Sequence, residues 1–422
     1  MEATRIRLAE GVHLTYLPAR KFKTSLLSAQ FVTPLRRETA GANALLAAVL
    51  RRGTVSCPDM GALSAKMDNL YDASIDYTVR KKGENQCVGF VASFIDDRYA
   101  PGGERLLEPA AALRGELVCD PVTYHGRFVP EYFESEKTNL LEAIRSLIND
   151  KRDWADSRLL RALCDGEAYA VPRLGDEETV DKLQALKVYT QYRDLISTAP
   201  LEIIYSGSAD LERVKQALAA AFATLPREEV RVISTAAPHV CRESVQHVED
   251  VLDVTQGKLG MGFSCGSDDV PALLMGNTLF GGSSNSKLFL NVREKLSLCY
   301  YASSLYHRQK GLITVSSGIE FQNYQRAYDE IMAQLEAVQK GELEDWELEG
   351  ARSTLLNSYA TVGDSQGKLE NFYLGQAATG QHETPADLAR AIQDMTAERI
   401  CRAMSTVKLD TVYFLKGKEA EA

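Results

Sequence analysis

Histidine, cysteine and carboxylate side chains are the groups in this sequence that could hold a catalytic metal ion. A catalytic zinc site takes about three such ligands and leaves one position open for water. The sequence has six histidines, and no two of them lie three to five residues apart, as two ligands on one helix would. The nearest pair is His239 and His247, and we expect each to be an exposed loop residue. The other histidines are His13, His125, His307 and His382. They offer no set of metal ligands.

Other chemistries find little support. No set of serine, histidine and aspartate residues lies in a sequence context that indicates a catalytic triad. The pair Gly281-Gly282 is not followed by the Gly-Lys-Ser/Thr of a phosphate loop. A formal net charge of −10 argues against nucleic acid, which needs a concentrated basic surface. An enzyme with unrelated chemistry is therefore disfavoured.

The elements that would position a site occur twice. Residues 201–207 and 409–417 each predict a strand that ends in glycine, about 210 residues apart, and each follows a helical segment, at 179–195 and 385–404. Amphipathic helices are predicted to begin at Glu136 and Glu347, again about 210 residues apart. Further strands are expected at 26–33, 88–94, 259–264 and 312–317. The chain therefore looks like a duplication.

The length of 422 residues also favours two domains. We predict domains at 1–226 and 245–422, joined by a polar, proline-containing linker at 227–244. The mixed order of strands and helices indicates an α+β fold, in which each domain is an antiparallel sheet with helices packed on one face.

Cysteine usage and the first residues bear on location. The eight cysteines form no Cys-x-x-Cys pair and are expected to be small buried thiols in a reducing compartment. The first ten residues lack the apolar core of a signal peptide, and no apolar run reaches the roughly 18 residues of a membrane span. We expect a cytoplasmic protein without a membrane partner.

Residues 41–54 read Gly-Ala-Asn-Ala-Leu-Leu-Ala-Ala-Val-Leu-Arg-Arg-Gly-Thr. This segment resembles the helix of the M16 (pitrilysin-like) metallopeptidases that carries the inverted zinc motif His-x-x-Glu-His and ends in Gly-Thr. Aligned on the final Gly-Thr, the histidine positions fall on Ala44 and Ala48, and the glutamate position falls on Ala47. Alanine has no lone pair for a metal. The resemblance therefore implies a peptidase fold, twice per chain, that cannot hydrolyse a peptide by itself.

The third zinc ligand of that family is a glutamate on a second helix, in a pattern like Glu-Lys-x-x-x-x-Glu-Glu-Ile. Here the ligand position falls on Ala143, and Glu142 is rotated about 100° away from it around the helix. No metal and no cofactor are therefore expected. The alanines also suit a tight helix–helix contact, and we expect the two helices to close over the space that zinc would occupy.

A second resemblance covers residues 281–300, similar to the M16 pattern Gly-Gly-x-x-Ser-x-Arg-Leu-Phe-x-x-Val-Arg-Glu-Lys-x-x-Leu-x-Tyr. It places the family arginine on Arg293 and the family tyrosine on Tyr300, and it implies that both hold a substrate carbonyl near the metal. The plainer interpretation is that both residues pack their domain. Tyr301 would point the other way along a strand, and Lys287 replaces a usual arginine.

Residues 70–79 resemble the family strand beside the active site. A sheet edge of this kind can accept a peptide as an added strand, and this needs no zinc. The plainer interpretation is an ordinary strand.

Together these resemblances cover nearly the whole chain and are most similar to the non-catalytic subunit of a bacterial M16 pair. The expected partners are a peptide or protein substrate and a zinc-bearing M16 chain, or a second copy of this chain. The alternative is a stand-alone scaffold that binds a peptide or protein segment. Within the group, the chain is similar to proteins associated with an aminopentanol modification of elongation factor P.

Overall fold

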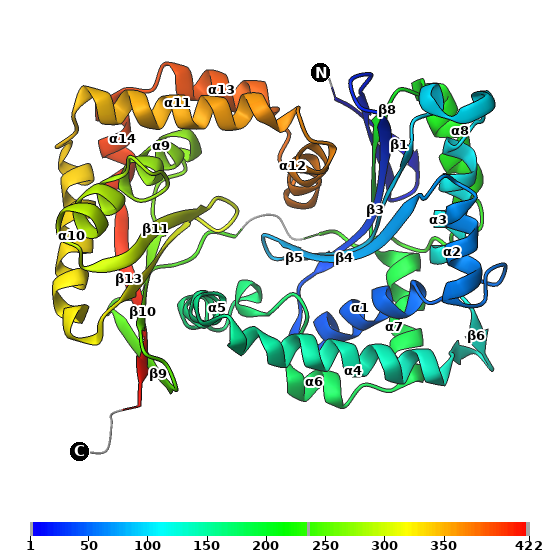
Figure 1. Ribbon diagram of the computed structural model, residues 1–422, viewed down its shortest axis with the longest axis horizontal. Coiled ribbons are helices and arrows are strands. Elements are labelled where there is room, and N and C mark those ends of the chain that lie inside the picture. Colours follow the sequence, from blue (N-terminus) through cyan, green and yellow to red (C-terminus); the bar gives the residue numbers. More distant parts are fainter. Residues whose placement is uncertain (1–2, 234–236, 419–422) are drawn as a thin grey trace. The chain divides into compact units, whose positions relative to one another are not determined.

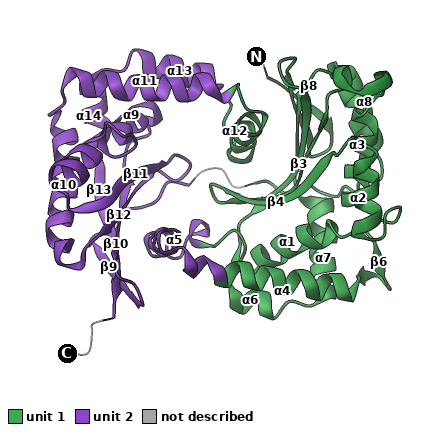
Figure 2. Ribbon diagram, in the orientation of Figure 1, with its two compact units in different colours: residues 1–145, 171–235, 363–382 green, residues 146–170, 236–362, 383–422 purple. Residues whose placement is uncertain are grey.

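The computed structural model describes residues 3–233 and 237–418 and contains two compact units (Figures 1 and 2). Unit 1 comprises residues 1–145, 171–235 and 363–382, and unit 2 comprises residues 146–170, 236–362 and 383–422. Neither unit is a continuous stretch of sequence, because each contains one segment from the other half of the chain. Residues 234–236 of the predicted linker lie outside the described residues.

Unit 1 is built on a six-stranded sheet with the order β1-β2-β8-β3-β5-β4. Neighbouring strands are antiparallel except for the parallel pair β2 and β8. The strand bounds are β1 (Thr4–Ala9), β2 (Val12–Pro18), β3 (Thr24–Pro34), β4 (Ser74–Lys82), β5 (Asn85–Ile95) and β8 (Leu201–Gly207). The short strands β6 (Thr123–Tyr124) and β7 (Arg127–Phe128) form a separate hairpin.

The helices of unit 1 share one hydrophobic core with this sheet, in which the odd-numbered side chains of β3, such as Leu27 and Phe31, are buried. They are α1 (Arg37–Leu50), α2 (Met60–Asp68), α3 (Leu107–Cys119), α4 (Pro130–Ser146), α6 (Glu177–Asp181), α7 (Ala185–Thr198) and α8 (Leu211–Ala221). Helix α12 (Gln366–Thr379), from the second half of the chain, belongs to the same unit but packs on β8 and β3 outside this core.

Unit 2 is built on a five-stranded sheet with the order β11-β12-β10-β13-β9. Its strands are β9 (Gln246–Leu252), β10 (Gly257–Cys265), β11 (Cys299–His307), β12 (Leu312–Ile319) and β13 (Val407–Gly417). Its helices are α5 (Lys151–Leu163), α9 (Val270–Phe280), a π-helical segment η5 (Leu288–Lys295), α10 (Tyr324–Lys340), α11 (Asp345–Val362), α13 (Pro385–Gln393) and α14 (Ala397–Met404).

The two sheets confirm the predicted duplication. The strand order β2-β8-β3-β5-β4 of unit 1 matches β9-β13-β10-β12-β11 of unit 2, strand for strand in sequence order. The parallel pair of unit 1 corresponds to the parallel pair β9 and β13 of unit 2. Each predicted helical segment before a glycine-ending strand is two helices, α6 and α7 in one half and α13 and α14 in the other. The predicted α+β class is thus confirmed, with one parallel pair in each sheet.

Helices α5 and α12 occupy equivalent places in the duplication, and each belongs to the unit that is formed mainly by the other half of the chain. Helix α5, which follows α4 in the first half, packs on β10 and β13 of unit 2. A Cβ atom at Gly260 would lie 3.2 Å from Leu159 of α5, and one at Gly262 would lie 2.7 Å from Leu163. These glycines therefore allow α5 to approach the sheet closely. Between them, Met261 points into the core on the opposite face. The unit 2 sheet is therefore covered on both faces.

Helix α12 covers the corresponding face of unit 1 through polar contacts. Ser28 Oγ on β3 donates a hydrogen bond of 2.6 Å to Glu370 on α12. The amide of Gln366 donates to the main-chain carbonyls of Thr24 and Ser206 at 3.0 and 2.7 Å. Because Glu370 accepts this hydrogen bond, the polar side chain of Ser28 can be buried on this face of β3.

The predicted linker is anchored at both described ends. On the unit 1 side, the Arg227 guanidinium donates hydrogen bonds to the main-chain carbonyls of Ile196 and Ala199. On the unit 2 side, His239 and Arg242 bind Asp410, which is fully buried on β13. These contacts hold each end of the connection to its own unit.

All eight cysteines are thiols and not disulfides, as expected. Among the described residues, no helix is both long enough and apolar enough to cross a membrane.

Candidate functional site

Helix α1 carries the alanines that stand at the family's zinc positions. Residues 40–50 of this helix are all buried. Ala44 and Ala48 lie one turn apart on the same face, and both line a cavity in unit 1. Ala47 does not line this cavity. It faces the hydrophobic core instead, beside Phe31 and Val88, and is 1% exposed.

Helix α4 forms a second wall of the same cavity. Glu136, Asn139, Leu140 and Ala143 line it, and their spacing of three and four residues places them on one helical face. Ala143 is exposed on this wall. The third ligand position of the family therefore lies at the same cavity as Ala44 and Ala48, as the resemblance implies.

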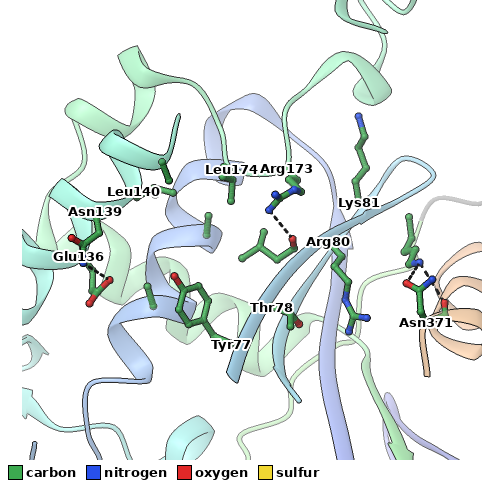
Figure 3. A pocket seen from close by; sticks show the side chains of 15 residues that line it. Tyr77, Thr78, Arg80, Lys81, Glu136, Asn139, Leu140, Arg173, Leu174 and Asn371 are labelled. Carbon is green, nitrogen blue, oxygen red and sulfur yellow. Dashed lines mark hydrogen bonds between the residues drawn. The ribbon is translucent and has the colours of Figure 1, made fainter. Parts of the chain in front are cut away.

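Strand β4 forms the third wall and is the edge strand of the unit 1 sheet. Figure 3 shows Tyr77, Thr78, Arg80 and Lys81 coming from this strand, with Arg80 and Lys81 pointing in opposite directions. Lining residues thus come from both faces of β4. The cavity therefore extends around the open edge of the strand.

The cavity has a volume of about 710 Å³, which is within the range of small-molecule and peptide side-chain pockets. The expectation that the two helices close over the former zinc space is wrong. The edge of β4 and its long side chains stand beside α1 and α4, so the alanines leave an open cavity instead of a helix–helix contact.

Two main-chain carbonyls on the open edge of β4 accept hydrogen bonds from arginine side chains. Arg51 Nε donates to the carbonyl oxygen of Ile75 at 2.6 Å, and Arg173 donates to that of Val79 at 3.2 Å. These carbonyls point away from β5. Because the direction alternates along a strand, the N–H and C=O of Tyr77 also point to the open edge.

The carboxylates at the cavity are already paired. Glu136 accepts hydrogen bonds from Arg52 at 2.5 Å and from Asn139 at 3.2 Å. Glu370, which is buried behind the cavity, accepts two hydrogen bonds from the Arg80 guanidinium, at 2.6 and 2.7 Å. Burial and the nearby Glu136 raise the pKa of Tyr77, so its hydroxyl stays protonated.

Zinc does not fit the residues that line this cavity. Glu136 is the one carboxylate among the described lining residues, and they include no histidine or cysteine. A catalytic zinc takes about three protein ligands, and Glu136 is engaged by Arg52. Cations line the cavity instead: Arg80, Lys81, Lys82 and Arg173. The described lining residues therefore offer charged and main-chain hydrogen-bonding groups, but not the ligand set of a catalytic zinc.

Arg293 and Tyr300 both lie in unit 2. Arg293, in η5, stacks over the Phe289 ring at 4.7 Å, and its side chain is 39% exposed. Tyr300, on the edge strand β11, is 61% exposed and donates a hydrogen bond of 2.6 Å to Glu320. That hydrogen bond and the charge of Glu320 raise the pKa of Tyr300. Both side chains are therefore accessible, each with its own local partner.

Two neighbouring residues have structural roles. Lys287 is buried and pairs with Glu347 at 2.9 and 3.1 Å, so it holds η5 to α11. Tyr301 is partly covered by the Arg152 guanidinium, 4.3 Å above its ring. In η5, the Leu296 N–H donates to the carbonyl of Asn291 five residues earlier, a π-helical bond that is frequent at functional sites.

His247 is exposed as expected, but it lies in strand β9 and not in a loop, and the expectation for His239 is wrong. The His239 side chain is 3% exposed, with Nδ1 2.5 Å from Glu167 and Nε2 3.2 Å from Asp410. Cys164 lies close enough to His239 and Glu167 to complete a three-ligand metal group. However, Lys310 and Arg242 already neutralise the two carboxylates, so this cluster needs no metal to balance its charge.

The sequence prediction missed the basic residues of the cavity. The run Arg80-Lys81-Lys82, at the end of a predicted edge strand in an acidic chain, is the signal that could have indicated them. Arg173 lies between α5 and α6, far from that strand in sequence, and carries no local signal.

Comparison with known proteins identifies the family of this chain. Residues 182–355 match the family model described as the peptidase M16 inactive domain. The chain is 34% identical, over 97% of its length and 96% of the relative's, to a probable inactive metalloprotease, YmfF, of Bacillus subtilis (strain 168).

Solved structures show the same fold. A conserved protein from Enterococcus faecalis V583 superposes with a TM-score of 0.90 at 26% identity, and a peptidase M16 inactive domain from Pseudomonas fluorescens superposes with a TM-score of 0.80 at 18% identity. Each match covers 100% of both chains. This chain therefore belongs to the M16 peptidase family, as an inactive homologue.

Proposed function

We propose that this chain is a non-catalytic, peptide-binding M16 subunit that holds an extended peptide as an added strand on β4. The observation that carries the proposal is the cavity of about 710 Å³ that extends around the open edge of β4. A peptide there would pair with main-chain groups of the strand, and its side chains would enter the cavity between α1 and α4.

Tyr77 lies at the centre of this edge. Its N–H and C=O point away from β5, between the carbonyls that Arg51 and Arg173 occupy. Its side chain is 45% exposed and lines the cavity. A bound peptide could therefore form its first pair of main-chain hydrogen bonds at this residue.

The substitution Tyr77→Pro tests peptide binding by strand addition. Proline removes the N–H that faces the open edge and leaves the hydrogen bonds between β4 and β5 in place. Tyr77→Ala is the matched control, because it removes the side chain and keeps the N–H. We expect fluorescence anisotropy with a labelled, extended octapeptide to show at least tenfold weaker binding for Tyr77→Pro than for Tyr77→Ala. Equal affinities would contradict strand addition.

We further propose that the chain pairs with a zinc-bearing M16 chain and lends it Arg293 and Tyr300 for holding the substrate. The exposure of both side chains on unit 2 supports this proposal. A partner from the same organism with an intact His-x-x-Glu-His motif should co-purify with this chain. In the mixture, Tyr300→Phe should lower peptidase turnover roughly 100-fold, the cost of one lost oxyanion donor. Tyr301→Phe is the control, and unchanged turnover with Tyr300→Phe would exclude the role of Tyr300.

The alternative is a stand-alone scaffold, a monomer or homodimer, that binds a peptide or protein segment in the cytoplasm, with elongation factor P modification as a process it could serve. The eight thiols suit a reducing compartment. Size-exclusion chromatography of this chain with and without the candidate partner separates the two functions. A shift to a one-to-one complex supports the subunit, whereas unchanged elution together with peptide binding supports the scaffold.

A further inference from the structure

The cavity beside β4 carries a local excess of positive charge in an acidic protein. Arg80, Lys81, Lys82 and Arg173 line it, against one carboxylate, Glu136. The whole chain has a formal net charge of −10. A concave surface lined by one sign of charge concentrates ligands of the opposite sign.

Ion pairs within the unit account for part of this charge. Arg80 is held by both oxygens of Glu370, whose side chain is 3% exposed, and Glu136 is paired with Arg52. The charges of these four side chains cancel within the two pairs. An incoming charged ligand would have to break one of these partly buried pairs to use them, which is costly.

Lys82 and Arg173 are different, because their described hydrogen-bond acceptors are neutral. Lys82 Nζ donates to the side-chain and main-chain oxygens of Asn371, at 2.6 and 3.3 Å. Arg173 donates to the carbonyl of Val79. Within the described part of the chain, neither of the two forms an ion pair. Burial removes water from the Lys82 ammonium and thereby lowers the pKa of this group.

We propose that Arg173 and Lys82 bind a carboxylate of the peptide held on β4, so that the cavity selects peptides with an acidic side chain or a free C-terminus. The inference rests on the proposed function. The cavity that contains the former zinc positions Ala44, Ala48 and Ala143 is also lined by these ammonium and guanidinium groups, which bind carboxylates through charge-assisted hydrogen bonds.

The position of Arg173 connects carboxylate binding to strand addition. A peptide N–H that pairs with the Val79 carbonyl takes the acceptor that Arg173 uses now. The guanidinium is then released at the cavity wall, where the peptide carboxylate provides a charged acceptor in exchange for a neutral one. A neutral peptide offers no such exchange, so the same displacement costs it a hydrogen bond.

The test measures the fluorescence anisotropy of four labelled octapeptides derived from one uncharged sequence. Two of them differ only at the C-terminus, which is free in one and amidated in the other. The other two are both amidated and carry either a glutamate or a glutamine at a central position. We expect at least one carboxylate peptide to bind roughly tenfold more tightly than its neutral counterpart at low salt. The two pairs identify whether the C-terminus or the side chain supplies the carboxylate. The double variant Arg173→Gln/Lys82→Gln should remove the preference, and Lys187→Gln, an exposed lysine on α7 outside the cavity, should keep it.

Equal binding of all four peptides that is still lost in Tyr77→Pro would overturn the carboxylate site and leave the proposed function intact. If no peptide binds, the proposed function fails, and thermal unfolding with succinate decides the carboxylate site separately. Succinate that raises the Tm of the native chain but not of the double variant supports the site, and no difference overturns it.

Discussion

Arg173 donates a hydrogen bond of 3.2 Å to the main-chain carbonyl of Val79, so a side chain from a distant loop occupies the open edge of β4. Arg51 does the same at Ile75. An uncovered edge strand pairs readily with other chains, and charged side chains on it prevent unwanted pairing. The arginines therefore protect the edge at which we place the peptide, and a bound peptide must displace at least one of them.

Replacing Arg173 should favour neutral peptides. Arg173→Ala removes a hydrogen bond that competes with the peptide, worth about 1 kcal/mol, so a neutral amidated octapeptide should bind several-fold more tightly. Isothermal titration calorimetry measures this change, with Lys187→Ala as the control for loss of a positive charge. Weaker binding of the neutral peptide would show that Arg173 supports the edge instead of competing for it.

Restoring the ligands should restore a zinc site. Because Ala44, Ala48 and Ala143 line one cavity, the triple variant Ala44→His/Ala48→His/Ala143→Glu should bind about one zinc ion per chain, measured by atomic emission after dialysis. The control Ala44→His/Ala48→His/Glu142→Gln changes as many residues but lacks the third ligand, and it should bind zinc much more weakly. Equal zinc content in the two variants would show that Ala143 is not at the ligand position.

The sequence predicted the elements of this fold more completely than their assembly. The spacing between 201–207 and 409–417 indicated the duplication, and the aligned motifs placed Ala44, Ala48 and Ala143 together. The exchange of α5 and α12 was not predictable, because the apolar pattern of a helix gives the face it buries but not the sheet that receives it.

Burial of polar side chains was the other limit. His239 lies in a polar, proline-containing segment, which is typical of an exposed loop, and it is buried because Glu167 and Asp410 bind both ring nitrogens.

The different environment of Ala47 was also not predictable. Ala47 could not be separated from Ala44 and Ala48 by helical spacing alone, since the three lie within about 100° of one another. Such outcomes depend on partners distant in the sequence.

Asp410 should make unit 2 sensitive to acid. Burial opposes its ionisation, but hydrogen bonds from the Arg242 main chain, Thr411 and His239 outweigh burial and lower the pKa of Asp410. A lowered folded-state pKa gives stability that is present above the unfolded-state pKa of about 3.9 and is lost as the pH falls through the folded-state value. Asp410→Asn should therefore destabilise the protein by about 3 kcal/mol at pH 7.

The difference in Tm between the native chain and Asp410→Asn should shrink as the pH falls below about 4. Differential scanning calorimetry at several pH values measures it, and Asp394→Asn, at an exposed position in the same unit, is the control. A difference that does not change with pH would contradict an ionised Asp410.

Carboxylate binding should weaken at alkaline pH because of Lys82. Burial lowers the pKa of the Lys82 ammonium in the free protein, whereas a bound carboxylate favours the charged form and raises this pKa. Binding therefore takes up a proton, and the affinity falls as the pH rises through the pKa of the free protein. Lys82→Arg keeps its charge throughout. Its affinity for a carboxylate peptide should therefore stay constant between pH 7 and 10, where that of the native chain falls. Identical pH profiles would exclude Lys82 from the site.

We expect this M16 chain to bind peptides without a metal. The most direct measurement combines the zinc content of the purified native chain with its octapeptide affinity before and after EDTA treatment. We expect far less than one zinc ion per chain and a Kd that EDTA leaves unchanged. One zinc ion per chain, together with peptide binding that EDTA abolishes, would contradict this expectation.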